Sequence, residues 1–284
     1  MSRMTSPVRA QWTDTARPPL SPRALTAALV RAGSLVTDLR VVPVTGSTND
    51  DVAELARAGA PEGLVLVAEE QTGGRGRLDR GWRSPPRAGL TFSVLLRPPP
   101  AVPVHRRTWL PLLAGLAVQQ AVERLSGVPV RLKWPNDVLL GVPTRTAGPA
   151  KVAGILVQAD GGAVVVGVGL NVSARRGELP PGGTSLAVEA AQCTDRDPLL
   201  RAILRRLGAL YAEWCARGGD PGGTRAAYEA VCDTLGRAVR VLLPNGTELT
   251  GTATGLDTDG RLVLSTTDGQ RAVSAGDVTH VRPG

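Results

Sequence analysis

Hydrophobic and polar positions follow one another along the chain in patterns that predict short strands and amphipathic helices. The clearest helix covers about residues 108–126, where apolar residues recur every three or four positions. Shorter helices are predicted over residues 22–32, 48–58, 199–214 and 224–234. Apolar runs predict strands over residues 39–44, 64–68, 90–96, 128–132, 152–158 and 163–168. We therefore expect an α+β domain over residues 39–234, in which helices pack on a central mixed or antiparallel sheet.

The pattern changes beyond Gly236, where short apolar runs are separated by hairpin signals. These signals are Asn245-Gly246, Asp259-Gly260 and Asp268-Gly269. They predict about four short strands, over residues 239–243, 249–256, 262–266 and 271–274. We expect a small all-β, barrel-like domain over residues 235–284. Residues 1–38 are expected to be an N-terminal extension with one short helix.

The composition argues against several classes of protein. The 284 residues are 42% hydrophobic and 20% charged, which allows a sizeable core. The longest apolar runs, over residues 110–118 and 163–172, are too short to cross a membrane, and the N-terminus does not read as a secretion signal. Three scattered cysteines and two histidines offer neither a disulfide framework nor a protein cage for a metal ion. We expect a cytoplasmic protein with no membrane contact.

The basic residues are unevenly divided between lysine and arginine. The net charge is +8, from 33 basic and 25 acidic residues, and fits a nucleic acid, an acidic substrate or a simple preference for arginine. Lys133 and Lys151 are the only lysines, so 33 minus 2, or 31, of the basic residues are arginines. Because a compact ammonium and a planar guanidinium recognise different geometries, the two retained lysines indicate functional positions.

The segment from Gln71 to Trp82, the arginine loop, combines glycines with Arg75, Arg77 and Arg80. Glycines allow backbone N–H groups to converge on an anion, and guanidinium groups bind phosphate or carboxylate in a forked geometry. The loop has neither the spacing of a P-loop nor that of a dinucleotide fingerprint. The alternative interpretation is a solvated arginine-glycine segment that binds nucleic acid, although such segments use repeats and aromatic platforms.

Three further motifs carry polar groups at strand ends. Residues 131–137 bring a cation, an indole, an amide and a carboxylate together, which suits a nucleotide but also fits an ordinary turn with a packed tryptophan. Lys151 begins an apolar strand, where it either enters a cleft or protects a sheet edge. Residues 167–171 contain two glycines that permit close approach of a flat ligand or of another strand. No nucleophile with a neighbouring base is found, so chemistry by positioning and positive charge is favoured, as in adenylyl transfer.

Five motifs in this order resemble the biotin protein ligases, over about residues 40–284. They are Gly46-Ser47-Thr48-Asn49, the arginine loop, Lys133-Trp134-Pro135-Asn136-Asp137, the run from Lys151 to Leu156, and Gly167-Val168-Gly169-Leu170-Asn171. The resemblance implies a class II synthetase-like catalytic domain and an SH3-like C-terminal β-barrel. It also implies that biotin and MgATP form biotinyl-5′-AMP, from which biotin passes to a lysine of the biotin carboxyl carrier domain of a carboxylase.

The resemblance further implies roles for individual residues. The implied biotin positions are Ser47, Thr48, Asn49, Gln71, Gly74, Arg75, Gly76, Arg77, Lys151, Gly154 and Gly167. The implied ATP or adenylate positions are Arg77, Arg80, Trp82, Lys133, Asn136, Asp137, Lys151 and Asn171. Lys151 and Arg77 are the implied catalytic residues. Mg²⁺ is expected to arrive with ATP, and Asp137 is a candidate ligand for it.

The chain departs from the family pattern at three places. Asp79 stands where glycine is usual in the loop, and Gln158 stands where an acidic residue is common. The first 40 residues lack the DNA-binding domain of the repressor-type members, so no specific DNA binding is expected. We expect a monomer or a weak homodimer. A lipoate or octanoate ligase is the alternative enzyme, disfavoured by the arginine loop and the C-terminal domain, and an arginine-rich nucleic-acid-binding protein is the alternative from another class.

Overall fold

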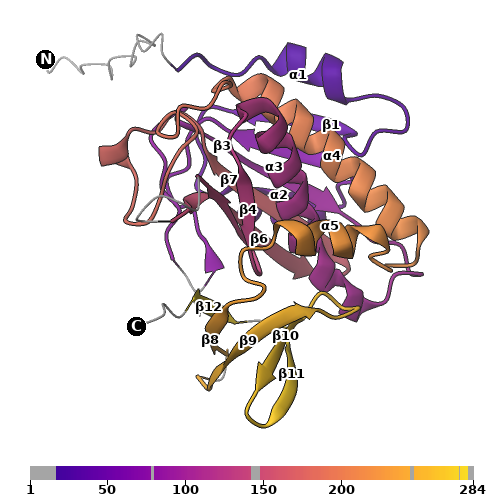
Figure 1. The fold of residues 1–284 in the computed structure, drawn as a ribbon. Helices are drawn as coiled ribbons and strands as arrows, with labels where there is room; N and C mark the ends of the chain where they lie inside the picture. The colour runs from indigo at the N-terminus through magenta and orange to yellow at the C-terminus, as the bar shows by residue number, and fades with distance from the viewer. Residues whose placement is uncertain (1–16, 78–79, 142–147, 244–245, 275, 281–284) are drawn as a thin grey trace, which may run out of the picture.

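The computed structural model of the protein describes residues 17–77, 80–141, 148–243, 246–274 and 276–280 (Figure 1). Asp79, Asn245 and the first sixteen residues of the predicted N-terminal extension lie outside this part of the chain. The α-helices are α1 (Pro22–Leu29), α2 (Thr48–Arg57), α3 (Leu110–Ser126), α4 (Arg196–Ala216) and α5 (Gly223–Val231). All five helices predicted from periodicity are present. Some of their ends differ from the predicted ends by a few residues, because caps as well as apolar spacing fix where a helix stops. Helix α3 stops at Ser126, as predicted, and is capped by Gly127, which has a left-handed φ of 68°.

In the described part of the chain, seven strands form the central sheet. They are β1 (Asp38–Val42), β2 (Leu64–Ala68), β3 (Gly89–Leu96), β4 (Val130–Lys133), β5 (Asp137–Leu140), β6 (Ala150–Asp160) and β7 (Ala163–Asn171). Their order is β1-β2-β3-β7-β6-β5-β4. The β1–β2 pair is parallel and the other neighbours are antiparallel, so the sheet is mixed, as predicted. Strand β5 was not predicted, because it has only four residues and begins at the last residue of the Pro135-Asn136-Asp137 turn signal.

Both faces of the sheet are covered, because successive side chains of a strand point to opposite sides. In β2, Val65 and Val67 belong to the large core that also contains α3 and α4. Leu64 and Leu66 instead pack with Val52 of α2 in a second, smaller cluster. Every residue of β2 is therefore buried, and its sequence is an unbroken apolar run rather than an alternating one. Helix α2 lies on the face of the sheet that bears this smaller cluster, where it contacts β3 and β7.

The C-terminal domain is an antiparallel sheet that lies below the central sheet in Figure 1. Its described residues form β8 (Ala238–Leu242), β9 (Glu248–Leu256), β10 (Leu262–Thr266), β11 (Gly269–Val273) and β12 (Asp277–His280), in the order β11-β10-β9-β8-β12. The prediction of about four strands was wrong by one. Strand β12 has four residues and pairs with β8, which is distant in sequence, so no local hairpin signal marks it.

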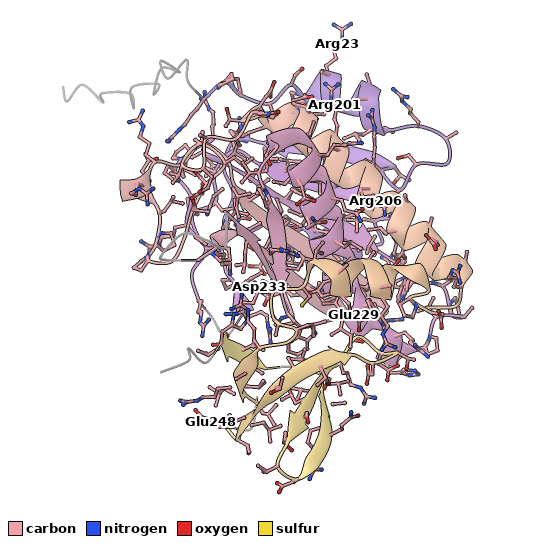
Figure 2. All side chains as sticks on the ribbon, in the orientation of Figure 1. Arg23, Arg201, Arg206, Glu229, Asp233 and Glu248 are labelled. Carbon is pink, nitrogen blue, oxygen red and sulfur yellow. The ribbon has the colours of Figure 1, made fainter. Side chains whose placement is uncertain are left out.

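The two domains are joined by hydrogen bonds as well as by packing. The Trp134 indole N–H donates to the Gly260 carbonyl at 3.1 Å, and Glu229 of α5 accepts a hydrogen bond from the Leu256 amide at 2.8 Å. Figure 2 labels Glu229 and Asp233 at this junction. Within the described residues, none of the helices has the length and apolar character needed to cross a membrane.

Candidate active site

One cavity, called the pocket below, gathers most of the side chains that the sequence analysis selected. It measures about 110 Å³ and lies among the start of α2, the arginine loop, and strands β3, β5, β6, β7 and β12. The predicted residues that line it are Ser47, Thr48, Asn49, Gln71, Arg75, Gly76, Arg77, Arg80, Trp82, Asn136, Asp137, Lys151, Gly154 and Gly167. The five sequence motifs therefore converge on one place, although Ser47 and Gly167 are 167 minus 47, or 120, positions apart.

The polar end of the pocket is built at the start of α2. Ser47 caps this helix through its hydroxyl, and Thr48 donates to the side-chain oxygen of Gln71 from both its amide and its hydroxyl, at 2.8 and 2.9 Å. The Asn49 amide group donates to the Leu156 carbonyl of β6 at 3.2 Å. Ser47, Thr48 and Asn49 are all buried. Hydroxyl and amide groups held in this way can both donate to and accept from a polar ring.

Ser93 completes this network, although the sequence analysis did not select it. Its hydroxyl lies 2.7 Å from the Thr48 hydroxyl and 2.6 Å from the Asn49 side-chain oxygen, and the residue is fully buried in β3. The available signal was a serine among the apolar residues from Leu90 to Leu96, because a buried hydroxyl requires a partner. Ser93 therefore fixes the orientation of the two side chains that face the pocket.

Glycines of β6 and β7 make room for side chains of the pocket. A Cβ atom on Gly167 would lie 2.8 Å from Cγ of Asn49, and one on Gly169 would lie 2.5 Å from Nε1 of Trp82. Such distances are too short for any other residue to stand there without movement. The Trp82 indole also approaches Lys151, whose Nζ is 5.9 Å from the ring centroid. Nε1 of Trp82 is buried and has no protein acceptor among the described residues.

Four cationic side chains of the described residues line the pocket, and three of them are paired with carboxylates. Nζ of Lys151 lies 2.6 Å from Asp137, Arg75 lies 2.5 Å from Asp50, and Arg80 is paired with Asp277. Four cations thus stand against three carboxylates, Asp50, Asp137 and Asp277, so an excess of one positive charge remains. This electrostatic balance favours an anionic ligand.

Arg77 is the fourth cation of the pocket. Its guanidinium donates to the side-chain oxygen of Asn136 at 3.3 Å. Burial lowers the pKa of Arg77, while the fields of Asp277 and Asp137 raise it. A guanidinium stays protonated in proteins, so the lowered pKa marks a partly desolvated cation. A negatively charged group placed beside it would compensate for that desolvation.

Three predicted residues do not line the pocket. Gly74 lies at the base of the arginine loop, where its carbonyl accepts from the Trp82 amide at 2.8 Å. The Asn171 amide group donates to the Thr184 carbonyl at 3.0 Å, so the buried side chain holds a loop instead of facing the pocket. Lys133 ends β4, where its charge helps to lower the pKa of His280. For Asn171 and Lys133 the predicted contact with the nucleotide remains a prediction.

A second cavity adjoins the pocket and shares Arg77 and Asn136 with it. It measures about 390 Å³ and is bordered by apolar side chains that include Leu112 and Trp134. Within the described ranges, no group of three or more histidine, cysteine, aspartate or glutamate side chains is placed to hold a metal ion. The site therefore consists of the pocket, with its polar end and its cations, and of a larger second cavity with mostly apolar walls.

Comparison with known proteins gives matches along most of the chain. Residues 41–173 match the Biotin/lipoate A/B protein ligase family, and residues 234–281 match the Biotin protein ligase C terminal domain. The biotin--[acetyl-CoA-carboxylase] ligase of Mycobacterium tuberculosis is 44% identical over 95% of this chain and 98% of its own length. The bifunctional ligase/repressor BirA of Escherichia coli is 32% identical over 79% of this chain and 68% of its own length.

The fold leads to the same family. A biotin protein ligase from Aquifex aeolicus, solved in complex with biotin and ATP, superposes with a TM-score of 0.72 at 29% identity, covering 87% of this chain and all of that one. This likeness confirms the predicted class II synthetase-like fold, and the C-terminal match confirms the predicted SH3-like domain. The pocket geometry, the two matched domains and the 44% identity agree, and the chain belongs to the biotin protein ligases.

Proposed function

We propose that this protein activates biotin with MgATP and transfers it to a lysine of the biotin carboxyl carrier domain of a carboxylase. The observation that carries the proposal is the joining, in one pocket, of a hydrogen-bonding slot at Ser47, Thr48 and Asn49 with the cations Arg77 and Lys151. The name of the mycobacterial relative and the biotin and ATP bound by the Aquifex ligase support it.

The biotin head group would lie at the polar end of the pocket. Its ureido ring offers both donors and acceptors, which match the hydroxyls of Ser47 and Thr48 and the amide of Asn49. Gly167 leaves space beside Asn49 because its backbone has no Cβ atom. The ring would thus be recognised by groups already fixed by Gln71 and Ser93.

The biotin carboxylate and the α-phosphate would meet beside Lys151. One carboxylate oxygen attacks the α-phosphorus, the bond to pyrophosphate breaks, and Arg77 and Lys151 stabilise the negative charge that develops on the phosphate. Arg80 and Asn136 extend the same surface toward the other phosphates and the nucleoside. Mg²⁺ would arrive with ATP, and Asp137, a carboxylate in the pocket, suits an oxygen-preferring cation.

Transfer requires that a carrier lysine reach the mixed anhydride. Its amine attacks the acyl carbon, AMP leaves, a proton is lost and an amide forms. Neither histidine would act as the base for this step, because His105 belongs to the turn before α3 and His280 contacts Thr234 at the domain junction. We propose instead that catalysis of transfer comes from holding the adenylate in place.

The test is exchange of labelled pyrophosphate into ATP by the purified protein, with biotin, lipoate and octanoate as separate substrates. We expect exchange with biotin and at most trace exchange with the other two acids. Exchange that prefers lipoate or octanoate would assign the alternative ligase activity. Absence of exchange with every acid, together with salt-sensitive binding of DNA or RNA, would instead favour nucleic-acid binding.

A further inference from the structure

The C-terminal domain contributes a carboxylate to the pocket. Asp277 lies on β12 and is paired with Leu242 of β8 in the C-terminal sheet, yet its side chain lines the pocket of the catalytic domain. Both nitrogens at the end of the Arg80 side chain approach it: Nη2 contacts Oδ2, and Nη1 lies 3.5 Å from Oδ1. Asp277 and Arg80 are 197 positions apart in sequence, so only the packing of the two domains brings them together.

This carboxylate occupies a guanidinium, that of Arg80, which the proposed function assigns to phosphate binding. A guanidinium binds a carboxylate and a phosphate through the same two-pronged contact, so the two anions compete for it. Asp277 also acts through its field on Arg77, the other guanidinium assigned to phosphate binding. One aspartate of the C-terminal domain therefore neutralises part of the charge on which ATP binding depends.

We propose that Asp277 is an internal competitor of ATP: its carboxylate pairs with Arg80 and is exchanged for a phosphate when the nucleotide binds. The proposal rests on the function proposed above, because Arg77 and Arg80 are taken as phosphate partners. Its consequence is that nucleotide binding removes a contact between the arginine loop and the C-terminal domain. Binding of ATP is thereby coupled to the position of that domain.

The size of the effect follows from the exposure of the pair. The side chains of Arg80 and Asp277 are 66% and 34% exposed, and ion pairs this accessible contribute little in water. Asp277→Asn keeps the shape of the side chain and removes its charge. We expect this change to lower the KM for ATP about two- to fivefold and to leave kcat within about twofold.

A double-mutant cycle distinguishes competition from a direct role of Asp277. Arg80→Ala alone should raise the KM for ATP. If Asp277 acts mainly through Arg80, then Asp277→Asn should lose most of its effect when Arg80 is already alanine. The matched control is Glu248→Gln, which removes a carboxylate of the same domain, labelled in Figure 2, whose partner Arg240 lies 3.7 Å away and outside the pocket. It should leave the KM unchanged.

The measurement is pyrophosphate exchange at varied ATP, combined with calorimetry using a non-hydrolysable ATP analogue. A KM that rises or stays constant in Asp277→Asn would overturn the proposal, as would an undiminished effect in the Arg80→Ala background. Thermal unfolding of each variant verifies that the domains remain folded. If the wild-type protein shows no biotin-dependent exchange, the proposed function fails, whereas calorimetry still reports whether Asp277 opposes nucleotide binding.

Discussion

At the scale of single residues, Trp82 shows how a glycine can determine the position of a functional side chain. The indole lies against β6 and β7 where these strands carry Gly154 and Gly169. A Cβ atom on Gly154 would lie 3.2 Å from Nζ of Lys151 and 3.4 Å from Cζ3 of Trp82. The lysine and the indole therefore pack over the same glycine, Gly154, and a displacement of one moves the other.

We expect Gly169→Ala to damage activity more than stability. The new methyl group would displace the Trp82 indole from the pocket wall, and misplacement of about an ångström beside reacting groups costs on the order of tenfold to a hundredfold in rate. The measurement is kcat/KM for biotin in pyrophosphate exchange, with thermal unfolding as a parallel readout. Gly177→Ala is the control, because nothing lies within 4 Å of its added Cβ. Equal kinetic effects of the two changes would contradict this account.

At the scale of elements, a buried ion pair fixes the base of the arginine loop. Glu69 follows β2, two residues before Gln71, and lies 2.5 Å from Arg196 at the start of α4, with side chains only 6% and 5% exposed. Arg196 also donates to the Pro18 carbonyl at 2.6 Å, and Glu69 accepts from the Leu20 amide at 2.6 Å. Helix α4, strand β2 and the segment before α1 thus meet at one point.

Removal of one partner of this pair should be costly. Arg196→Met leaves a buried carboxylate without its cation, and we expect a loss of about 3–5 kcal/mol in the free energy of unfolding. Arg217→Met, at the C-cap of the same helix, removes an exposed pair with Glu213 and should cost less than about 0.5 kcal/mol. Urea unfolding measures the free energy of unfolding of both variants and of the wild type. Combining Glu69→Gln with Arg196→Met should recover part of the loss, and no recovery would argue against uncompensated charge as its cause.

The elements were largely predictable from the sequence, whereas the contacts between distant elements were not. Apolar spacing identifies α3 and the β6–β7 hairpin, because both are local patterns. Ser93 carries only a weak signal, and the pairs Glu69–Arg196 and Arg80–Asp277 carry none, since they join positions 127 and 197 residues apart. The hydrogen bond from the Asn171 amide group to the Thr184 carbonyl was not predictable either, because it depends on the local path of residues 172–184, and the contact of Asn171 with the nucleotide remains a prediction.

At the scale of the whole molecule, the protonation of His280, at the junction of the domains, makes the stability of the protein depend on pH. Its Nε2 lies 3.4 Å from the Thr234 hydroxyl, and that hydroxyl accepts from the Trp134 amide at 3.1 Å. Burial, reinforced by the charge of Lys133, lowers the pKa of His280 to about 4. The folded protein therefore holds this imidazole neutral under conditions where the unfolded chain, with a pKa near 6.5, already protonates it.

Acidification should weaken the protein through this group. Between about pH 6.5 and pH 4 the unfolded state binds more protons, so the stability present above pH 6.5 declines as the pH falls. From pH 7.5 to pH 5 the loss attributable to His280 should be about 2 kcal/mol. Urea unfolding of His280→Gln should lack that component. His105→Gln, whose side chain is 63% exposed, should retain it, and identical pH profiles for the wild type and His280→Gln would refute the prediction.

The scarcity of lysine in the whole chain affects what happens when the adenylate escapes. Arg77→Ala removes a cation from the pocket, so release of biotinyl-5′-AMP should become faster, by about tenfold if one charge-assisted contact is lost. Lys133 and Lys151 carry the only side-chain amines of the chain that can then be modified, and Lys151 lies in the pocket beside Asp137. The variant should therefore biotinylate an added lysine-rich protein extensively and itself very little. Mass spectrometry measures both products. An unchanged release rate would show that Arg77 does not control escape of the adenylate. A heavily biotinylated enzyme would show that its low lysine content does not limit self-modification.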